Sequence, residues 1–153
     1  MSSIIKMTEI PSASAVAYHK FIEGFPVWWP REYTWSKNKL KLITINTHEN
    51  GLCSEFGPDD FRCDWGRVLE LVPGKKIRLL WQIDHARAPQ PDPAKCSEVE
   101  ITFDDIHEHS CQLKLVHRHF DKHEDKNHLY FEAMNGQHGW DYILGCFVDF
   151  CSN

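Results

Sequence analysis

The last part of the chain carries an apolar stripe with the period of an α-helix, and this stripe constrains the fold most strongly. Trp140, Ile143, Leu144, Phe147 and Val148 stand at spacings i, i+3, i+4, i+7 and i+8. Such spacing places all five side chains on one face of a helix. A helix of this kind must bury its stripe against another apolar surface, which the rest of the chain has to supply.

The middle of the chain supplies that surface, because its apolar residues alternate with the period of a β-strand. Asn50-Gly51 is a strong hairpin signal, and Pro73-Gly74 indicates a second turn. Strict alternation places Trp65, Arg67, Leu69 and Leu71 on one face of their strand. The expected strands are 3–10, 40–45, 52–56, 64–71, 76–83, 97–103 and 110–119.

These elements predict an α+β fold. An antiparallel sheet of six to seven strands is expected to pack against a long C-terminal helix, which begins near Asn127 although Gly136 and Gly139 weaken its middle. Two short helices follow the first strand, at 13–23 and 25–30. No internal repeat or linker interrupts the pattern, so residues 1–153 are expected to form a single domain.

Composition excludes some classes of function. The formal net charge is −5, whereas proteins that bind nucleic-acid backbones carry a basic stripe. Residues 1–10 contain one lysine and no continuous apolar run, so neither a secretory signal nor a membrane span is expected there. We therefore expect a cytoplasmic protein that binds neither nucleic acid nor membranes. The six cysteines form no CxxC motif and are interpreted as free thiols.

Five segments in order along the chain resemble one known family. They are Ala17–Pro30, Trp65–Leu69 followed by Pro73, Ser97–Phe103, Leu113–Arg118 and Gly139–Leu144. The chain is similar to the single-domain bacterial proteins related to the activator of the heat-shock-protein-90 ATPase, in the START-like (SRPBCC, Bet v 1-like) superfamily. The resemblance is to the single-domain type, without the extra N-terminal domain of the eukaryotic co-chaperone, so the activator name is expected to transfer only as a family label.

The resemblance implies a helix-grip fold, in which a curved sheet wraps around the C-terminal helix and leaves a cavity between them. Members of the superfamily use this cavity for lipids, sterols, polyketides and other apolar ligands. The chain departs from the family at His119, because glycine is common after the His-Arg pair.

The main hypothesis is a binding module for a small apolar or amphipathic ligand. Burial of apolar surface would supply most of the affinity, and a few polar groups would orient the ligand. No catalytic residue, metal or other cofactor is assigned. The expected cavity lining is Phe56, Trp65, Trp81, Phe103, Leu115, His117, His119, Trp140 and Leu144.

His117 and His119 are two residues apart on an expected strand, so their rings should share a face, as in half of a zinc or iron site. The favoured interpretation is a pair of hydrogen-bonded wall histidines, because no third ligand stands at a fixed short spacing. The candidates for that ligand are His123, His128, Glu55 and Cys53.

Glu55 and Asp64 offer a carboxylate pair for acid–base chemistry, but they lie on different strands and a solvated Glu55 is favoured. An enzyme of the cyclase or hydrolase kind, with His117, His119 or Glu55 as acid or base, is the first alternative function. The second alternative is an interaction protein with a filled core, acting on a chaperone or as a homodimer.

Overall fold

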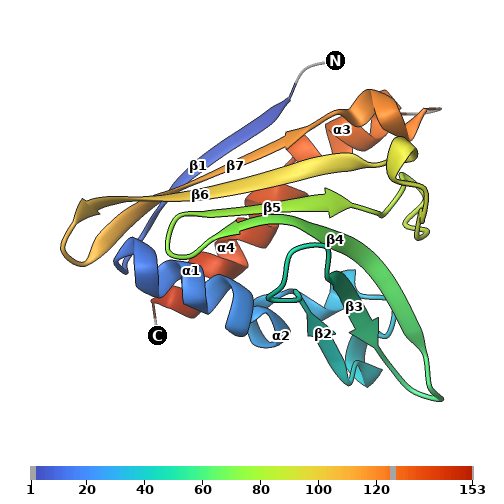
Figure 1. Ribbon diagram of the computed structural model, residues 1–153, viewed down its shortest axis with the longest axis horizontal. Coiled ribbons are helices and arrows are strands. Elements are labelled where there is room, and N and C mark those ends of the chain that lie inside the picture. The colour runs from blue at the N-terminus through green and yellow to red at the C-terminus, as the bar shows by residue number, and fades with distance from the viewer. Residues whose placement is uncertain (1–2, 125–126, 153) are drawn as a thin grey trace.

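One curved antiparallel sheet of seven strands forms the body of the protein (Figure 1). The computed structural model describes residues 3–124 and 127–152. The strands follow the spatial order β1-β7-β6-β5-β4-β3-β2, which makes β1 and β2 the two edges. They are β1 Ile4–Ile10, β2 Leu42–Thr44, β3 Leu52–Phe56, β4 Arg62–Val72, β5 Lys76–Trp81, β6 Ser97–His107 and β7 Ser110–Arg118.

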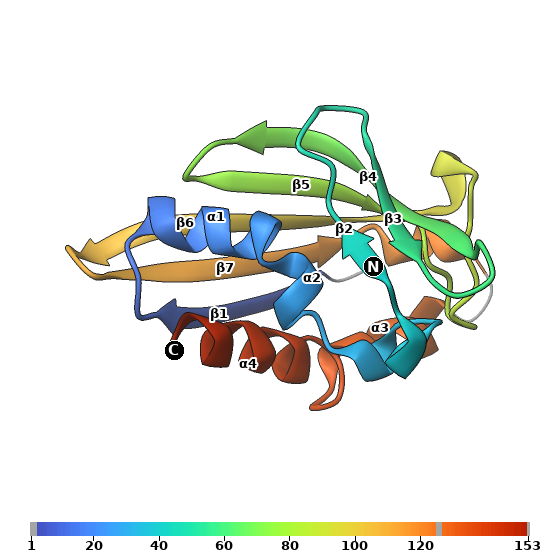
Figure 2. The ribbon, with the colours of Figure 1, turned by 90° about the horizontal axis from the view of Figure 1, so that it is seen from below.

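Two helices connect β1 to β2. Helix α1 (Ser14–Glu23) lies across β6 and β7, and the single turn α2 (Phe25–Trp28) follows it directly. Helix α4 (Trp140–Cys151) lies on the same side of the sheet and runs alongside β1 (Figure 2). Short 3-10 turns occur at Arg31–Tyr33, Lys37–Lys39, Pro93–Lys95 and Phe120–His123. The predicted α+β class, with a sheet wrapped around a C-terminal helix, is confirmed.

The expected start of the C-terminal helix near Asn127 is corrected, because the segment forms two helices. Helix α3 (Asn127–Asn135) ends before the two glycines, and α4 begins after them. A Cβ atom on Gly139 would lie 2.3 Å from the carbonyl oxygen of Met134, so the chain can approach α3 this closely only without a side chain. The glycines therefore break the helix rather than only weakening it.

Strand β4 does not alternate strictly, which corrects the face predicted for it. Ser54 of β3 pairs with Asp64 while Cys53 pairs with Gly66, so Trp65 is an extra residue in the ladder. A second irregularity lies between Val68 and Glu70. Each extra residue shifts the alternation by one position. Trp65 and Val68 are consequently buried, whereas Arg67, Leu69 and Leu71 are only partly buried.

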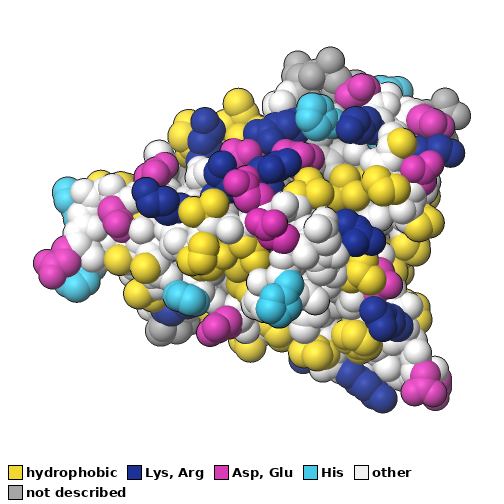
Figure 3. Space-filling view, viewed as in Figure 1, with side chains coloured by type: hydrophobic (Ala, Val, Ile, Leu, Met, Phe, Trp, Pro, Cys, Tyr) yellow, Lys and Arg dark blue, Asp and Glu magenta, His cyan; other side chains and the backbone are white. Residues whose placement is uncertain are grey.

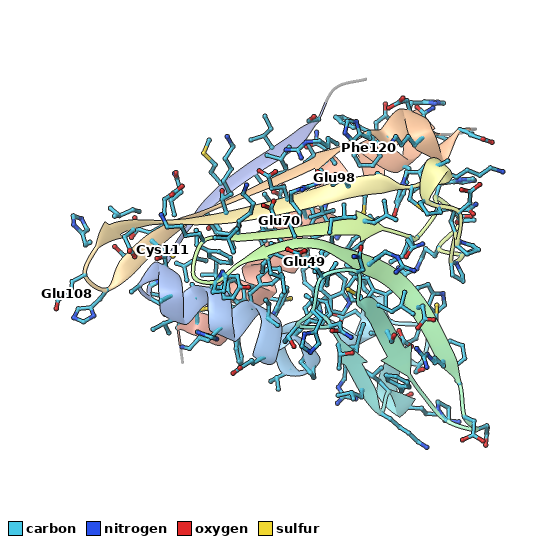
Figure 4. All side chains as sticks on the ribbon, viewed as in Figure 1. Glu49, Glu70, Glu98, Glu108, Cys111 and Phe120 are labelled. Carbon is cyan, nitrogen blue, oxygen red and sulfur yellow. The ribbon has the colours of Figure 1, made fainter. Side chains whose placement is uncertain are left out.

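The outer face of the sheet is charged, and acidic and basic side chains alternate across it (Figure 3). Arg78 of β5 bonds Glu70 of β4 at 3.2 Å and Glu98 of β6 at 3.2 Å, and Figure 4 labels both glutamates. Arg118 of β7 bonds Glu98 at 2.6 Å. These ion pairs connect neighbouring strands on a solvated surface, where each ion pair contributes little to stability.

Six cysteines are distributed over the described residues and all are free thiols, as predicted. Burial raises the pKa of the Cys63 thiol to about 11, and Glu55 beside it acts in the same direction. Across the described part of the chain, no helix combines the length and the apolarity needed to cross a membrane.

Candidate functional site

Aromatic rings fill one half of the space between the sheet and α4. Phe21 of α1 lies with its ring centroid 4.8 Å from that of Trp28, 5.1 Å from that of Phe147 and 6.1 Å from that of Phe103. All four side chains are at most 4% exposed. We call this set (Phe21, Trp28, Phe103 and Phe147) the closed half, because its rings pack directly against one another.

The other half contains an open pocket with a volume of about 80 Å³, which we call the outer pocket. It lies where the end of β5 and the loop after it meet α3 and α4. Its walls are mainly apolar, and Asp84 and Arg87 add charge. The lining residues are Trp29, Tyr33, Trp35, Trp81, Ile83, Asp84, Arg87, Tyr130, Met134 and Ile143.

A smaller chamber of about 20 Å³, the inner chamber, adjoins the outer pocket and shares four of its residues: Trp29, Tyr33, Trp35 and Ile83. Its remaining walls are Ile43, Glu55 and Trp65. These three side chains are at most 3% exposed, so the chamber is deeper in the protein than the outer pocket. A space of this size holds about one water molecule or one small polar group.

Hydrogen bonds fix the wall between the sheet and α3. The indole nitrogen of Trp81 donates to the Tyr130 hydroxyl at 2.8 Å, and that hydroxyl donates to the carbonyl oxygen of Ile83 at 2.8 Å. Burial raises the pKa of Tyr130, so its hydroxyl stays protonated. The Trp81 ring is thereby held against α3 in one orientation.

Polar contacts fix the position of the loop at the mouth of the outer pocket. Arg87 bonds the carbonyl oxygen of Tyr33 and its guanidinium lies 5.7 Å from the centroid of the Tyr33 ring. Trp35 donates its indole N–H to the carbonyl oxygen of Arg87 at 2.8 Å. The Tyr33 hydroxyl in turn donates to the carbonyl oxygen of His138 at 2.6 Å. The loop after β5 is thus linked to both Tyr33 and the α3–α4 connection.

Behind the Trp81 wall runs a buried chain of four polar side chains. Trp140 donates its indole N–H to Nδ1 of His117 at 3.0 Å, so the proton of this neutral ring is on Nε2. Nε2 lies 2.7 Å from the Ser97 hydroxyl and donates to it. The hydroxyl then donates to Nε2 of His123 at 2.6 Å. Both nitrogens of His117 therefore have protein partners.

Burial keeps both histidines of this chain neutral. Desolvation lowers the pKa of the fully buried His117 well below its usual value, and the nearby His123 acts in the same direction. Desolvation also lowers the pKa of His123 to about 4. Nδ1 of His123 is buried and has no hydrogen-bond partner among the described residues. The chain is a structural network with one unpaired nitrogen at its end.

Glu55 is fully buried, so the favoured interpretation of a solvated side chain is wrong. Its two carboxylate oxygens accept the backbone N–H groups of Trp35 at 3.1 Å and of Ser36 at 2.8 Å. Asp64 is instead bonded to Ser54 at 2.6 Å and to Arg62 at 3.0 Å. The two carboxylates thus have separate sets of partners.

The proposed lining residues are found in three different places. Trp81 lines the outer pocket and Trp65 the inner chamber. Five others are buried in the core and line neither space: Phe103, Leu115, His117, Trp140 and Leu144. Phe56 and His119 also line neither space.

Phe56 of β3 is paired with the exposed Leu42 of β2 and with Arg62 of β4. The Arg62 guanidinium lies 5.6 Å from the centroid of the Phe56 ring. Phe56 therefore belongs to the outer face of the sheet.

The prediction that His117 and His119 share one face of a strand is wrong. Strand β7 ends at Arg118, and His119 has a φ of 68°, in the left-handed region. Its side chain is exposed while that of His117 is buried, so the two rings do not share a face. Glycine adopts such a positive φ without steric cost, whereas other residues adopt it rarely. No group of three metal-binding side chains occurs within the described residues.

The sequence prediction missed several pocket residues, chiefly Tyr33, Trp35, Arg87 and Tyr130. Tyr33 ends a short 3-10 turn, Trp35 lies in the irregular segment after it and Arg87 lies in a loop, where periodicity gives no signal. Trp29 was favoured as core packing and does pack on Phe25 and Trp65, although it also lines both spaces.

Together, the curved sheet, the covering α4 and the aromatic interior define the helix-grip class of folds. The sequence model of the family described as "Activator of Hsp90 ATPase homolog 1-like protein" matches residues 28–149. The chain belongs to this family, as its sequence motifs indicated. No curated protein matches the chain at a significant level.

Solved structures share the fold at low sequence identity. The anthrahydroquino-gama-pyrone synthase Txn09, complexed with SUM, is 21% identical with a TM-score of 0.69, and the match covers 97% of this chain and 96% of that one. The self-sacrificing resistance protein CalC from Micromonospora echinospora is 20% identical with a TM-score of 0.69, covering 98% and 94%. Protein MLL2253 from Mesorhizobium loti is 13% identical with a TM-score of 0.68, covering 99% and 97%.

Proposed function

We propose that the protein binds a small, flat, apolar or amphipathic molecule in the outer pocket. The observation that carries this proposal is the contrast between the closed half, whose rings contact one another, and the outer pocket, where Trp29, Trp81 and Ile143 leave a volume unfilled. Apolar walls with a few polar groups at the mouth are the usual composition of a small-molecule site.

The size of the pocket limits the ligand. Drug-sized ligands occupy sites of about 300–1,000 Å³, and an engineered cavity of about 150 Å³ is known to bind benzene. The outer pocket, at about 80 Å³, is smaller than both. A single ring is therefore the largest unit that enters, and it does so by displacing Met134, a long and flexible side chain.

Fold relatives support the proposal only by analogy. Txn09 is a synthase and CalC is a resistance protein, so this architecture serves different functions. In this chain, both nitrogens of His117 are bonded within the protein and His119 is remote from the pocket. Binding rather than histidine-based turnover is the function that these contacts favour.

Calorimetric titration with toluene tests the proposal. The wild-type protein is expected to bind one toluene molecule, and Met134→Trp, which fills the pocket, is expected to lose binding. Leu129→Trp is the matched control, because Leu129 is on the same helix but is 50% exposed and lies outside the pocket lining. Absence of saturable binding by the wild type, or unchanged binding by Met134→Trp, would contradict the proposal.

A second candidate is an interaction protein, and the filled closed half favours it. Ile5 and Met7 of the edge strand β1 are 55% and 61% exposed on the outer face, where a protein partner or a second copy could cover them. Sedimentation of the purified protein tests this candidate. It requires self-association, or binding to a purified chaperone, that Met7→Lys abolishes, and a monomer indifferent to that change and to the chaperone contradicts it.

A further inference from the structure

Trp65, which lines the inner chamber, carries a hydrogen-bond donor with no acceptor in the described part of the chain. Nε1 of Trp65 is buried and has no partner among the described residues, although the ring itself is tightly packed. Its ring is stacked on that of Phe25, with centroids 5.4 Å apart and planes inclined by 15°, so it cannot turn to find a partner without breaking this contact. An unpaired buried N–H is costly, and a ligand atom that accepts from it would be favoured.

The same chamber contains an acceptor with spare capacity. Each carboxylate oxygen of Glu55 accepts one backbone N–H, from Trp35 or from Ser36. A carboxylate oxygen has two lone pairs, so Glu55 can accept a further hydrogen bond. Glu55 and Trp65 both line the chamber, which therefore presents one donor and one acceptor.

One kind of chemical group is small enough for the inner chamber and can bind both the Trp65 N–H and the Glu55 carboxylate. A hydroxyl accepts one hydrogen bond and donates another, and a volume of about 20 Å³ has room for roughly one such oxygen. Trp29, Tyr33, Trp35 and Ile83 line both spaces, so a ring in the outer pocket lies next to the chamber that would take its hydroxyl.

We propose that the ligand is a neutral hydroxylated aromatic compound whose hydroxyl binds between Trp65 and Glu55. The hydroxyl oxygen accepts from Nε1 of Trp65, and its hydrogen is donated to the Glu55 carboxylate. This inference rests on the proposed function, because it specifies the ligand of the same site. An anionic group is disfavoured, since no lysine or arginine is among the seven residues that line the chamber and Glu55 would repel it.

Competing titrations with phenol and toluene test the inference, because the two probes differ only by hydroxyl and methyl. The wild-type protein should bind phenol about tenfold more tightly than toluene, since the methyl group leaves the Trp65 N–H without an acceptor and gives Glu55 no further hydrogen bond. Benzoate should not compete. Equal affinities for phenol and toluene would overturn the inference and leave the proposed function standing, whereas failure of both probes to bind would overturn both.

Trp65→Phe tests whether the Trp65 N–H causes the preference for phenol, because it removes the N–H and keeps an aromatic ring. The preference for phenol should largely disappear in this variant and persist in Trp28→Phe, which makes the same change in the closed half. An unchanged preference in folded Trp65→Phe would overturn the inference. If Trp65→Phe does not fold, the indole N–H resonance of Trp65 in the wild type decides: it should shift with phenol far more than with toluene, and equal shifts contradict the proposal.

Discussion

The closed half and the outer pocket lie between the same sheet and the same helix, yet only one of them is filled. In the closed half, Phe21 contacts Trp28, Phe103 and Phe147 and the only polar contact of these rings is the bond from Trp28 Nε1 to the carbonyl oxygen of Phe21, among the described residues. Around the outer pocket, directional hydrogen bonds such as that between Trp81 and Tyr130 fix the orientation of the large side chains. The comparison teaches that close ring packing fills one part of this interior, whereas hydrogen bonds to ring edges orient the side chains around the part that stays open.

The largest expected effect is the loss of stability caused by a substitution in the closed half. Phe147→Ala should lower the free energy of unfolding by about 3–5 kcal/mol, because it leaves a cavity among rings that pack directly. Its folded fraction should keep the toluene site of the outer pocket, and the apolar cavity left by Phe147 can take a further toluene. Chemical denaturation and titration measure the two effects, and a weakened toluene affinity in Phe147→Ala would show that the halves are not independent.

The buried histidines predict a pH dependence of stability. Their pKa values are lowered on folding, so the unfolded state binds more protons between the usual histidine pKa of about 6.5 and the folded values. Stability is therefore present at neutral pH and lost as the pH falls from about 6.5 towards 4. The slope should reach at most about 1.4 kcal/mol per pH unit for each histidine.

His123→Gln should reduce this slope, because it removes one titrating ring and keeps an acceptor for Ser97. His19→Gln is the control, since His19 is exposed on α1 and should leave the slope unchanged. Denaturation at a series of pH values measures both variants. Equal slopes for His123→Gln and the wild type would mean that His123 is not held neutral by the fold.

Tyr130→Phe should have an intermediate effect that is local to the pocket. The change removes the hydroxyl that connects Trp81 to Ile83 and should cost about 1–2 kcal/mol of stability. Unlike Phe147→Ala, it should also change toluene affinity, because the Trp81 wall is freed. A stability loss without any change in affinity would contradict the role given to this hydrogen bond.

The smallest loss of stability is expected for a substitution on the outer face of the sheet. Glu98→Gln removes ion pairs with Arg78 and Arg118 and should cost about 1 kcal/mol or less, with the loss reduced further by salt. Toluene affinity should be unchanged, because Glu98 faces away from the interior (Figure 4). Denaturation at low and high salt measures this effect, and a loss comparable to that of Phe147→Ala would mean that the outer charges are essential to the fold.

How far the sequence predicted this structure depends on the kind of signal. Ile77, Leu79 and Trp81 alternate regularly and are all buried, and the stripe from Trp140 to Phe147 lies against the sheet as its period indicates. Trp65 is buried beside a bulge, and nothing in a strict period of two reveals an extra residue. Local patterns therefore predicted the layers but not the register of β4.

The candidate site was less accessible to prediction, because its residues meet only in three dimensions. Trp35, Glu55 and Arg87 come from an irregular segment, a strand and a loop, and their contacts depend on the tertiary path of the chain. The burial of Glu55 follows from two backbone N–H groups that approach it from a segment about twenty positions earlier. No local pattern of residue types predicts such an approach.

The most direct test of the central claim is a nitrogen–proton correlation spectrum that follows the indole N–H groups of the six tryptophans during a titration with toluene. The resonances of Trp35 and Trp81, which line the outer pocket, are predicted to shift saturably, while that of Trp28 in the closed half stays in place. A Trp28 resonance that shifts as much as that of Trp81, or a spectrum that toluene leaves unchanged, would contradict the account.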